Sequence, residues 1–427
     1  MAEASVEDTT NATAAGRSDV RRLRGHKAIA TCCIASRDRP GLIATSGEDG
    51  SVCWFDMRCK DLLHIMDVAE NPISSLCFKS GNNPYWLLAF PDDAGNEDII
   101  YASSENEVKV FDVHMVISLD IQTSVDVLEK VICSMLIHRD CNTEFILQLA
   151  SWKPLESYNY NKEEINQITC NSKSSFLAAA DDAGDIKIID IRQKCLYKTL
   201  RAAHESVSLN QPPDVSPYSF LALFLFTFAV ITGGLDSKLI MWDFSKGGPS
   251  NFMDLGKPDL ESGDNAAQCF NPAFVHAIAV PEVDMLEKLD KICVVARGDG
   301  VVDVINIESE FSAASSRGSS KPRKGGQSRS NGNASSRDSE NQDQNRRTRL
   351  RLDYSSGGHT AAVSCVFFEP DQTCDNNEFL TFEHKSEQKI MVIYVCGQVN
   401  WLCTTPTDSD NLVVCDTSKV VKVYTVA

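Results

Sequence analysis

The sequence predicts an all-β protein built from one repeated antiparallel unit, and two observations lead to this. First, one pattern recurs along the chain: a cluster of small residues, an acidic turn, and an alternating stretch that ends in an aromatic residue and Asp. Clear copies occupy residues 46–56, 103–112, 180–190 and 233–243, and weaker copies occupy 296–306 and 415–425. Second, each copy alternates with period two after a turn rich in Gly, Asp, Asn or Ser, which is typical of a β-hairpin.

Three copies follow a histidine at a similar distance, in Gly25-His26, Ala203-His204 and Gly358-His359. An early Gly-His and a late Trp-Asp, in units of about 40–45 residues, are typical of the WD-repeat family, which this chain resembles. The resemblance implies a seven-bladed WD40 β-propeller, in which each blade is one antiparallel sheet.

The family resemblance also implies a hydrogen-bonded blade lock, made by the histidine, an Asp of the turn and the Trp. The best match is His204 with Asp236 and Trp242. His26 and Asp49 match as well, although the Phe that replaces the Trp in this copy cannot donate a hydrogen bond. Metal ligation or catalysis is the alternative role for these histidines.

Seven blades are expected to start near Gly25, Asn71, Glu163, Ala203, Phe270, Gly358 and Cys396. The last of them has room for only three strands, and residues 20–24 can supply the fourth. Pairing the two ends of the chain in one sheet would close the ring and remove an exposed edge.

Several segments depart from the repeat. Residues 1–19 are expected to be a disordered leader to a propeller of residues 20–427, which irregular insertions interrupt at 115–150 and 205–229. Residues 376–396, in blade six, lack the Asp turn and the Trp-Asp ending. These segments are either surface insertions or translated non-coding or alternatively spliced sequence. In the first case blade four should be damaged, because Pro212 and Pro213 stand where a core strand is needed. The apolar run of residues 220–231 nevertheless indicates a buried strand pair.

Residues 309–358 are rich in Ser, Gly, Asn and Arg, and this composition predicts a disordered basic loop. The loop contrasts with a formal net charge of −18 for the whole chain. Its clusters at 321–324 and 346–351 indicate a nuclear import signal or a weak RNA contact, or else a solvated loop. No other nucleic-acid or membrane contact is expected. The cysteines, of which Cys170 and Cys415 are examples in apolar runs, are expected to be buried and reduced, as in the cytoplasm or the nucleus.

The chain carries no motif of a hydrolase, P-loop enzyme, zinc protease or dinucleotide-binding enzyme, so we expect no catalytic residue, no metal and no cofactor. Residues 43–58 instead resemble the sixteen-residue box through which some WD-repeat proteins dock on damaged-DNA-binding protein 1, the adaptor of cullin-4 ubiquitin ligases. This resemblance implies that Asp56 and Arg58 bind the partner. Alternatively, Arg58 simply pairs with a surface acid.

A second candidate ends in Asp190 and Arg192, but it departs from the box at Ala183 and Ile189. The expected function is therefore a non-catalytic scaffold, a monomer within a complex, that acts as a substrate receptor of a cullin-4 ligase. The alternative is a general WD-repeat scaffold in a nuclear complex linked to chromatin or RNA.

Overall fold

The computed structural model describes residues 20–36, 39–58, 61–79, 99–113, 153–171, 175–201, 204, 220–224, 229–257, 271–280, 292–307, 349–352, 362–366, 380–383, 389–392, 399–405 and 411–425. Every regular element within these ranges is a β-strand, and the strands form six four-stranded sheets and one two-stranded sheet. The all-β prediction is therefore confirmed.

The sheets follow one another in chain order, and we number them as blades. Blade one contains β2 (Ala30–Ala35), β3 (Leu42–Gly47), β4 (Ser51–Asp56) and β5 (Asp61–Asp67). Blade two contains β6 (Ile73–Phe78), β7 (Ile99–Ser104), β8 (Glu107–Asp112) and β9 (Glu156–Tyr158). Blade three contains β10 (Ile165–Cys170), β11 (Phe176–Asp181), β12 (Ile186–Asp190) and β13 (Cys195–Leu200).

Blade four contains β14 (Phe220–Phe224), β15 (Ala229–Gly233), β16 (Lys238–Asp243) and β17 (Gly248–Asp254). Blade five contains β18 (Val275–Ala279), β19 (Ile292–Arg297), β20 (Val302–Asn306) and β21 (Arg349–Leu352). The two-stranded sheet contains β22 (Leu380–Glu383) and β23 (Lys389–Val392). The last blade contains β24 (Val399–Thr405), β25 (Asn411–Asp416), β26 (Val420–Thr425) and β1 (Arg21–Arg24).

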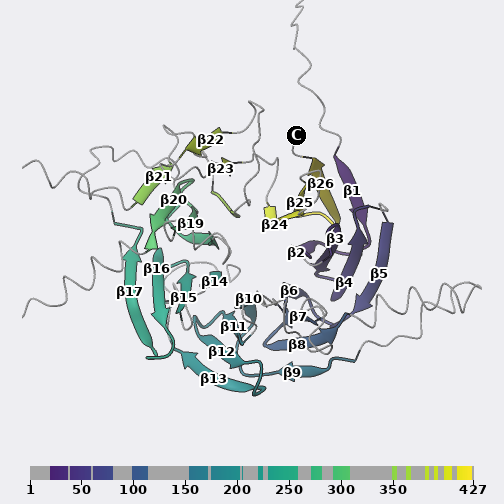
Figure 1. Ribbon diagram of the computed structural model, residues 1–427, viewed down its shortest axis with the longest axis horizontal. Coiled ribbons are helices and arrows are strands. Elements are labelled where there is room, and N and C mark those ends of the chain that lie inside the picture. Colours follow the sequence, from purple (N-terminus) through teal and green to yellow (C-terminus); the bar gives the residue numbers. More distant parts are fainter. Residues whose placement is uncertain are drawn as a thin grey trace, which may run out of the picture.

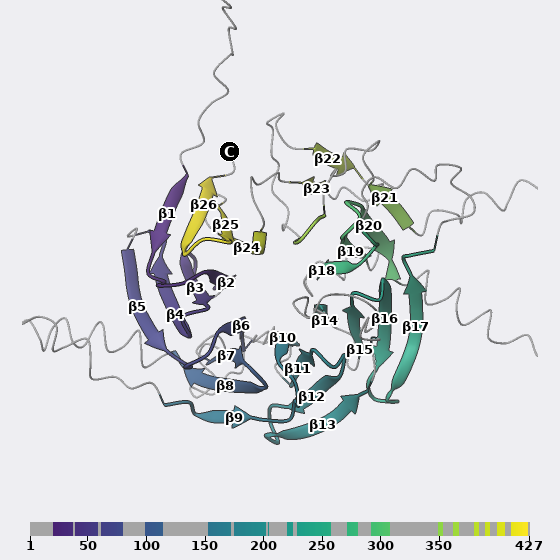
Figure 2. The ribbon, with the colours of Figure 1, turned by 180° about the vertical axis from the view of Figure 1, so that it is seen from behind.

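The blades stand around a ring, with the first strand of each near the centre and the fourth at the rim (Figures 1 and 2). The innermost strands of neighbouring blades touch: β2 lies against β24 and β6, and β10 lies against β6 and β14. This wheel of antiparallel sheets is a β-propeller.

The two ends of the chain meet in the last blade. There β1 pairs antiparallel with β26, with Arg21 opposite Val423 and Arg24 opposite Val420. The buried Leu23 joins a cluster that includes Val421 and Val423 of the same blade. The prediction that residues 20–24 supply the fourth strand is confirmed, and the blade no longer exposes β26 as an edge.

The alternation along β4 shows why the ring is stable. Val52 and Trp54 pack against blade two, whereas Cys53 and Phe55 face the last blade. Each of these side chains is at most 1% exposed. Since full burial of one large apolar side chain contributes about 1.5–3 kcal/mol, each blade depends on both neighbours to cover its two faces.

A repeated backbone hydrogen bond also joins neighbouring blades. The N–H that begins an innermost strand donates to a turn of the preceding blade. The bonds run from Ala30 to the Ser418 carbonyl (3.1 Å), from Ile165 to Glu105 (2.6 Å) and from Val275 to Gly234 (3.1 Å). Because each bond uses only backbone atoms, it fixes the spacing of blades whose side chains differ.

The described residues form six complete blades and not the seven predicted from the sequence. The difference lies in the stretch from Gly358 to residue 398. There the described residues are β22, β23 and the short segment 362–366. In Figures 1 and 2, β22 and β23 lie in the arc between blade five and the last blade. The missing Asp turn and Trp-Asp ending of residues 376–396 fall in this stretch.

Two further predictions need correction. Blade four keeps its first strand, because β14 begins after Pro212 and Pro213 in the sequence and pairs with β15 along its whole length. The run at 220–231 is thus the strand pair that its apolar residues indicate. The basic loop predicted for 309–358 is also too long, because residues 349–352 form β21 and pair with β20. Its other residues, the leader at 1–19, the insertion at 115–150 and residues 205–219 and 225–228 lie outside the described residues.

None of the described residues belongs to a helix that is long and apolar enough to cross a membrane.

Candidate functional site

The antiparallel order of each blade gives the ring two distinct faces. The turns that join the first to the second strand and the third to the fourth emerge on one face, which we call the Arg58 face. The turns between the second and third strands, and the connections to the next blade, emerge on the opposite face, which we call the His204 face. Residues that follow β4, β12 and β16 therefore share the Arg58 face.

Arg58 and Asp56 form one braced unit at the end of β4. The guanidinium Nε and Nη2 of Arg58 donate to the two carboxylate oxygens of Asp56 over 3.0 and 2.8 Å. The same carboxylate accepts the backbone N–H of Arg58 over 2.8 Å. The Arg58 side chain is 70% exposed and that of Asp56 only 10%. The carboxylate thus holds the guanidinium in a fixed position, with most of this planar cation facing solvent.

The turn that carries this unit is tied to its surroundings. The backbone N–H of the buried Met57 donates to Gly41 over 2.7 Å, and its carbonyl accepts from Arg21 Nη1 over 2.8 Å. Gly41 has a φ of 89°, and a Cβ there would lie 3.2 Å from Arg58 Cγ. Glycine therefore both adopts the left-handed conformation and leaves room for the arginine.

The second candidate pair has a different geometry. Asp190 accepts the backbone N–H groups of Arg192 and Gln193, both over 2.9 Å. Arg192 is exposed, and no ion pair to its guanidinium occurs within the described residues. Asp243 of blade four likewise accepts the N–H of Ser245 over 3.1 Å. The Asp that ends the third strand therefore caps the following turn in three of the described blades. Of these three, Asp56 is the one that also pairs with an arginine of its own turn.

The structure brings His204, Asp236 and Trp242 together on the His204 face of blade four. His204 Nδ1 lies 2.9 Å from Asp236 Oδ1, and Nε2 lies 2.8 Å from the hydroxyl of Thr232. Trp242 Nε1 donates to the same hydroxyl over 3.0 Å. The threonine hydroxyl therefore links the tryptophan to the histidine.

Blade one repeats the arrangement without the indole. His26 Nδ1 lies 3.2 Å from Asp49 Oδ1, and Nε2 lies 2.8 Å from the hydroxyl of Thr45. Burial raises the pKa of Asp49, but hydrogen bonds from the Lys27 N–H, from Ser51 and from His26 outweigh it, so the net pKa is lowered. Phe55 stands where blade four has its Trp.

Sequence reasoning missed the two threonines, although a signal for them exists. Thr45 and Thr232 each stand four residues before the Asp of the turn. Both are buried on the second strand of a blade, facing the histidine.

Blades three and five stabilise this region differently. In blade three, Asn161 Nδ2 donates to Asp181 over 3.0 Å. In blade five, the buried Asp303 accepts from Arg297 Nη1 (2.9 Å) and from Arg349 Nε and Nη2 (2.9 and 2.7 Å). Burial raises the pKa of Asp303. The guanidinium groups of Arg349 and Arg297 lower it by more than burial raises it, so the net pKa lies below its ordinary value. Part of the basic cluster at 346–351 therefore serves this buried network.

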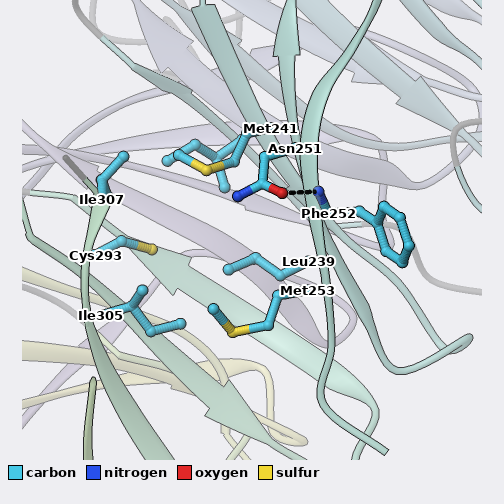
Figure 3. A pocket seen from close by; sticks show the side chains of 9 residues that line it. Leu239, Met241, Asn251, Phe252, Met253, Cys293, Ile305 and Ile307 are labelled. Carbon is cyan, nitrogen blue, oxygen red and sulfur yellow. Dashed lines mark hydrogen bonds between the residues drawn. The ribbon is translucent and has the colours of Figure 1, made fainter. Parts of the chain in front are cut away.

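An apolar pocket lies between blades four and five (Figure 3). Asn251 is its polar member, and its side-chain oxygen accepts the backbone N–H of Phe252 over 2.9 Å. Burial raises the pKa of the Cys293 thiol, so the protonated form is favoured there. The lining consists of Ile231, Leu239, Met241, Asn251, Phe252, Met253, Cys293, Ile305 and Ile307. This set contains no acid–base pair for chemistry near neutral pH.

The described cysteines are free thiols, Cys415 buried and Cys170 half-buried. Burial raises the pKa of the Cys53 thiol to about 12. Within the described residues, no group of three or more His, Cys, Asp or Glu side chains could hold a metal ion.

Comparison with known proteins agrees with this architecture. The family model described as "WD domain, G-beta repeat" matches residues 17–56, a range that includes β1 to β4. The "WD repeat-containing protein 53 homolog" of Dictyostelium discoideum is 24% identical over 307 residues, which cover 68% of this chain and 65% of that protein. The chain thus matches slightly less than two thirds of the relative's length.

The sequence of residues 163–190, 271–279 and 399–426 is itself similar to WD repeat-containing protein 53, and this comparison confirms the likeness. WD40 propellers generally mediate protein–protein contacts and are generally non-catalytic. With the repeat match, the related sequence and the propeller ring in place, the chain is similar to WD-repeat proteins, and to WD repeat-containing protein 53 among them.

Proposed function

We propose that this WD-repeat scaffold docks through its Arg58 face on damaged-DNA-binding protein 1 and acts as a substrate receptor of a cullin-4 ubiquitin ligase. The observation that carries the proposal is the Arg58–Asp56 unit. Its guanidinium is held by a nearly buried carboxylate, on a turn fixed by Met57, yet it stays 70% exposed. A cation ordered before binding loses little conformational entropy when a partner contacts it.

The simpler interpretation, in which Arg58 only pairs with a surface acid, is consistent with part of this geometry, because Asp56 is that acid. An exposed ion pair contributes about 0–1 kcal/mol to stability. A buried, hydrogen-bonded charge at an interface is worth about 2–5 kcal/mol when truncated. Removing Arg58 should therefore hardly change the fold but should strongly reduce adaptor binding if the proposal is right.

The test is co-precipitation of the full-length chain with the purified adaptor, followed by titration of the pair. Arg58→Ala is expected to abolish co-precipitation and to weaken binding by at least about thirtyfold, while the melting temperature stays within about 2 °C of wild type. Arg192→Ala serves as the matched control, because Arg192 is an exposed arginine on the same face without an acid brace in its own turn. Unchanged binding by the Arg58 variant refutes the proposal.

The alternative, a nuclear scaffold that contacts chromatin or RNA through the basic loop, needs a deletion that spares the fold. Arg349 pairs with the buried Asp303 and belongs to β21, so the deletion has to end before it. If removal of residues 310–346 abolishes nuclear or RNA association while adaptor binding persists, the basic loop carries a separate function. Nuclear and cytoplasmic residence are both compatible with the proposal, and imaging of the same deletion distinguishes them.

We also infer that the arc between blade five and the last blade holds a seventh blade, with residues 362–366 in its innermost strand. The Val363 N–H donates to the Arg297 carbonyl over 3.0 Å, in the manner of Ala30, Ile165 and Val275. Val363 also packs against Val294 and Val304 of blade five. Cys365, two residues further on, reaches the last blade through a hydrogen bond that involves the backbone of Leu402. Burial raises the pKa of the Cys365 thiol to about 12, although this hydrogen bond acts to lower the pKa.

This inference makes Val363 as important to the ring as Val275. Val363→Asp and Val275→Asp should each bury an unpaired charge and lower the melting temperature by at least about 5 °C. A Val363 variant that melts like wild type would contradict the seventh blade.

A further inference from the structure

A strip of basic side chains from blades three and four lies on the Arg58 face and borders blade two. We call it the basic strip, and it consists of Arg192, Lys194, Lys198 and Lys246, with the exposed Leu155 at one end. It lies at the rim, where β9, β13 and β17 follow one another (Figures 1 and 2). The strip is notable because the chain as a whole carries a formal charge of −18.

The members of the strip are joined across the blade boundaries. Lys194 of blade three forms an ion pair with Glu156 of blade two, next to Leu155. Lys198 Nζ donates to the Ser245 carbonyl of blade four over 2.9 Å. Lys246 follows Ser245 directly, so the strip is one continuous surface.

The backbone at Lys194 is strained, and this is independent of the charge pattern. Lys194 has a φ of 56°, and Gly247 of blade four has a φ of 78°. Each stands four residues after the Asp that caps its turn, Asp190 or Asp243. A side chain in this conformation costs roughly 1–2 kcal/mol, which glycine avoids. Blade three therefore keeps a lysine at a position where glycine would be more stable.

The acids near the strip are already engaged. Glu156 pairs with Lys194, and Asp190 accepts two backbone N–H groups. Hydrogen bonds from Lys246 and Ser245 lower the pKa of Asp243 to about 2. The side chains of Lys194 and Lys246 nevertheless remain 64% and 83% exposed.

The strip also offers apolar surface, and the opposite face differs from it in charge. Leu155 is 57% exposed and Tyr197, beside Lys198, is 41% exposed. On the His204 face, burial and then the charges of Asp182 and Glu105 raise the pKa of Glu164, as expected where carboxylates are crowded. A partner attracted to the basic strip would thus be acidic and would carry an apolar side chain.

We propose that the basic strip docks an acidic segment of a partner protein, one that carries carboxylates and at least one exposed apolar side chain. The inference goes beyond the adaptor contact, because the strip lies on blades three and four and includes neither Arg58 nor Asp56. Its strained lysine, its continuity across two blade boundaries and its mixed basic and apolar character all favour such a peptide.

The test uses a fluorescein-labelled synthetic peptide of alternating Glu and Asp with one central Leu, titrated with the full-length chain by fluorescence anisotropy. The double variant Lys194→Gly/Lys246→Ala is expected to bind roughly three- to tenfold more weakly, because each exposed charge pair contributes up to about 1 kcal/mol. Binding by the wild type should also weaken as ionic strength rises. The matched control is Lys162→Ala/Lys257→Ala on the His204 face, which should bind like wild type.

Lys194→Gly by itself separates binding from folding. Glycine adopts a φ of 56° without cost, so this variant should melt at the wild-type temperature or slightly above while it loses peptide affinity. Adaptor binding by this variant should be unchanged, and Arg58→Ala should leave peptide binding unchanged, so the two proposals can fail separately.

Three results would overturn the inference. The strip variants could bind the peptide as wild type does. A single-stranded RNA oligonucleotide or a phosphatidylserine vesicle could bind with the same sensitivity to the variants, which would assign the strip to another class of ligand. Sedimentation could show self-association of the wild type that the variants abolish, which would make a second copy of the chain the partner.

Discussion

The threonine hydroxyls of the two blade locks differ by one hydrogen bond, from Trp242, and this difference predicts how much each threonine contributes to stability. In blade four, the Thr232 hydroxyl contacts both His204 and Trp242. In blade one, the Thr45 hydroxyl contacts His26, and Phe55 offers no second polar partner. Both threonines are at most 1% exposed, and both histidines are about 5% exposed. Substitution by Val keeps the shape of each side chain and removes only the hydroxyl.

The expected losses follow from the groups left without a partner. Each buried polar group deprived of its hydrogen bond costs about 1–3 kcal/mol. Thr45→Val leaves the Nε2 atom of His26 without its hydrogen bond and should lower the free energy of unfolding by about 1–3 kcal/mol. Thr232→Val leaves both the Nε2 atom of His204 and the indole N–H of Trp242 without a hydrogen bond. Its free energy of unfolding should therefore fall by about 2–6 kcal/mol.

Urea unfolding followed by circular dichroism measures both losses, with the denaturant slope checked for constancy. A Trp242→Phe variant provides the internal control, because it makes blade four resemble blade one. In that background Thr232→Val should cost only what Thr45→Val costs. Equal losses for the two single variants, or additive effects of Thr232→Val and Trp242→Phe, would refute the hydrogen-bonded chain through Thr232.

Two further predictions concern a turn and an acid of blade one. Gly50 has a φ of 69°, and a Cβ there would lie 2.0 Å from the Ala69 carbonyl oxygen, so Gly50→Ala should destabilise the chain by about 2–4 kcal/mol in the same urea assay. Gly248→Ala is its control, because a Cβ there meets nothing within 4 Å, and a comparable loss at both positions would contradict the argument. The lowered pKa of Asp49 means that its ionised form stabilises the fold above the unfolded pKa of about 3.9, and that this contribution disappears as the pH falls through the lower folded value. The stability difference between wild type and Asp49→Asn should therefore be largest near neutral pH and should shrink below about pH 4 in thermal melts, whereas a difference that grows in acid would have the wrong sign.

The ring and its closure could be predicted from the sequence because they rest on local patterns. Period-two alternation identified the strands, and the three-stranded last copy identified the need for a strand from residues 20–24. The position of His26 and His204 in the repeat also predicted that each contacts the Asp of its own blade's turn. In each of these cases, neighbouring residues in the sequence determine the contact.

The errors arose where composition concealed the pattern. The two prolines before β14 predicted a damaged blade four, although the apolar residues that follow them indicated the strand that forms there. In β21 the sequence Arg-Leu-Arg-Leu alternates as a strand should, but its charge suggested a loop. The partner of Arg349 is Asp303, which lies 46 residues away, and no local pattern reveals such a pair.

The geometry of the Arg58–Asp56 unit could be predicted only in part. Its residues were visible in the sequence, but the turn that holds it depends on Gly41 of another turn in the same blade and on Arg21 of the neighbouring last blade. Likewise, the basic strip brings together lysines from separate blades, and its strained Lys194 is evident only from the backbone conformation.

The most direct test of the proposed function is hydrogen exchange of the full-length chain, measured with and without the purified adaptor. Docking through the Arg58 face should slow exchange at residues 39–42 and 56–58, the second of which begins at the end of β4. It should leave the turn at residues 48–50, on the His204 face of the same blade, unchanged. Protection confined to the turn at 48–50, or no protection in blade one at all, would contradict the account.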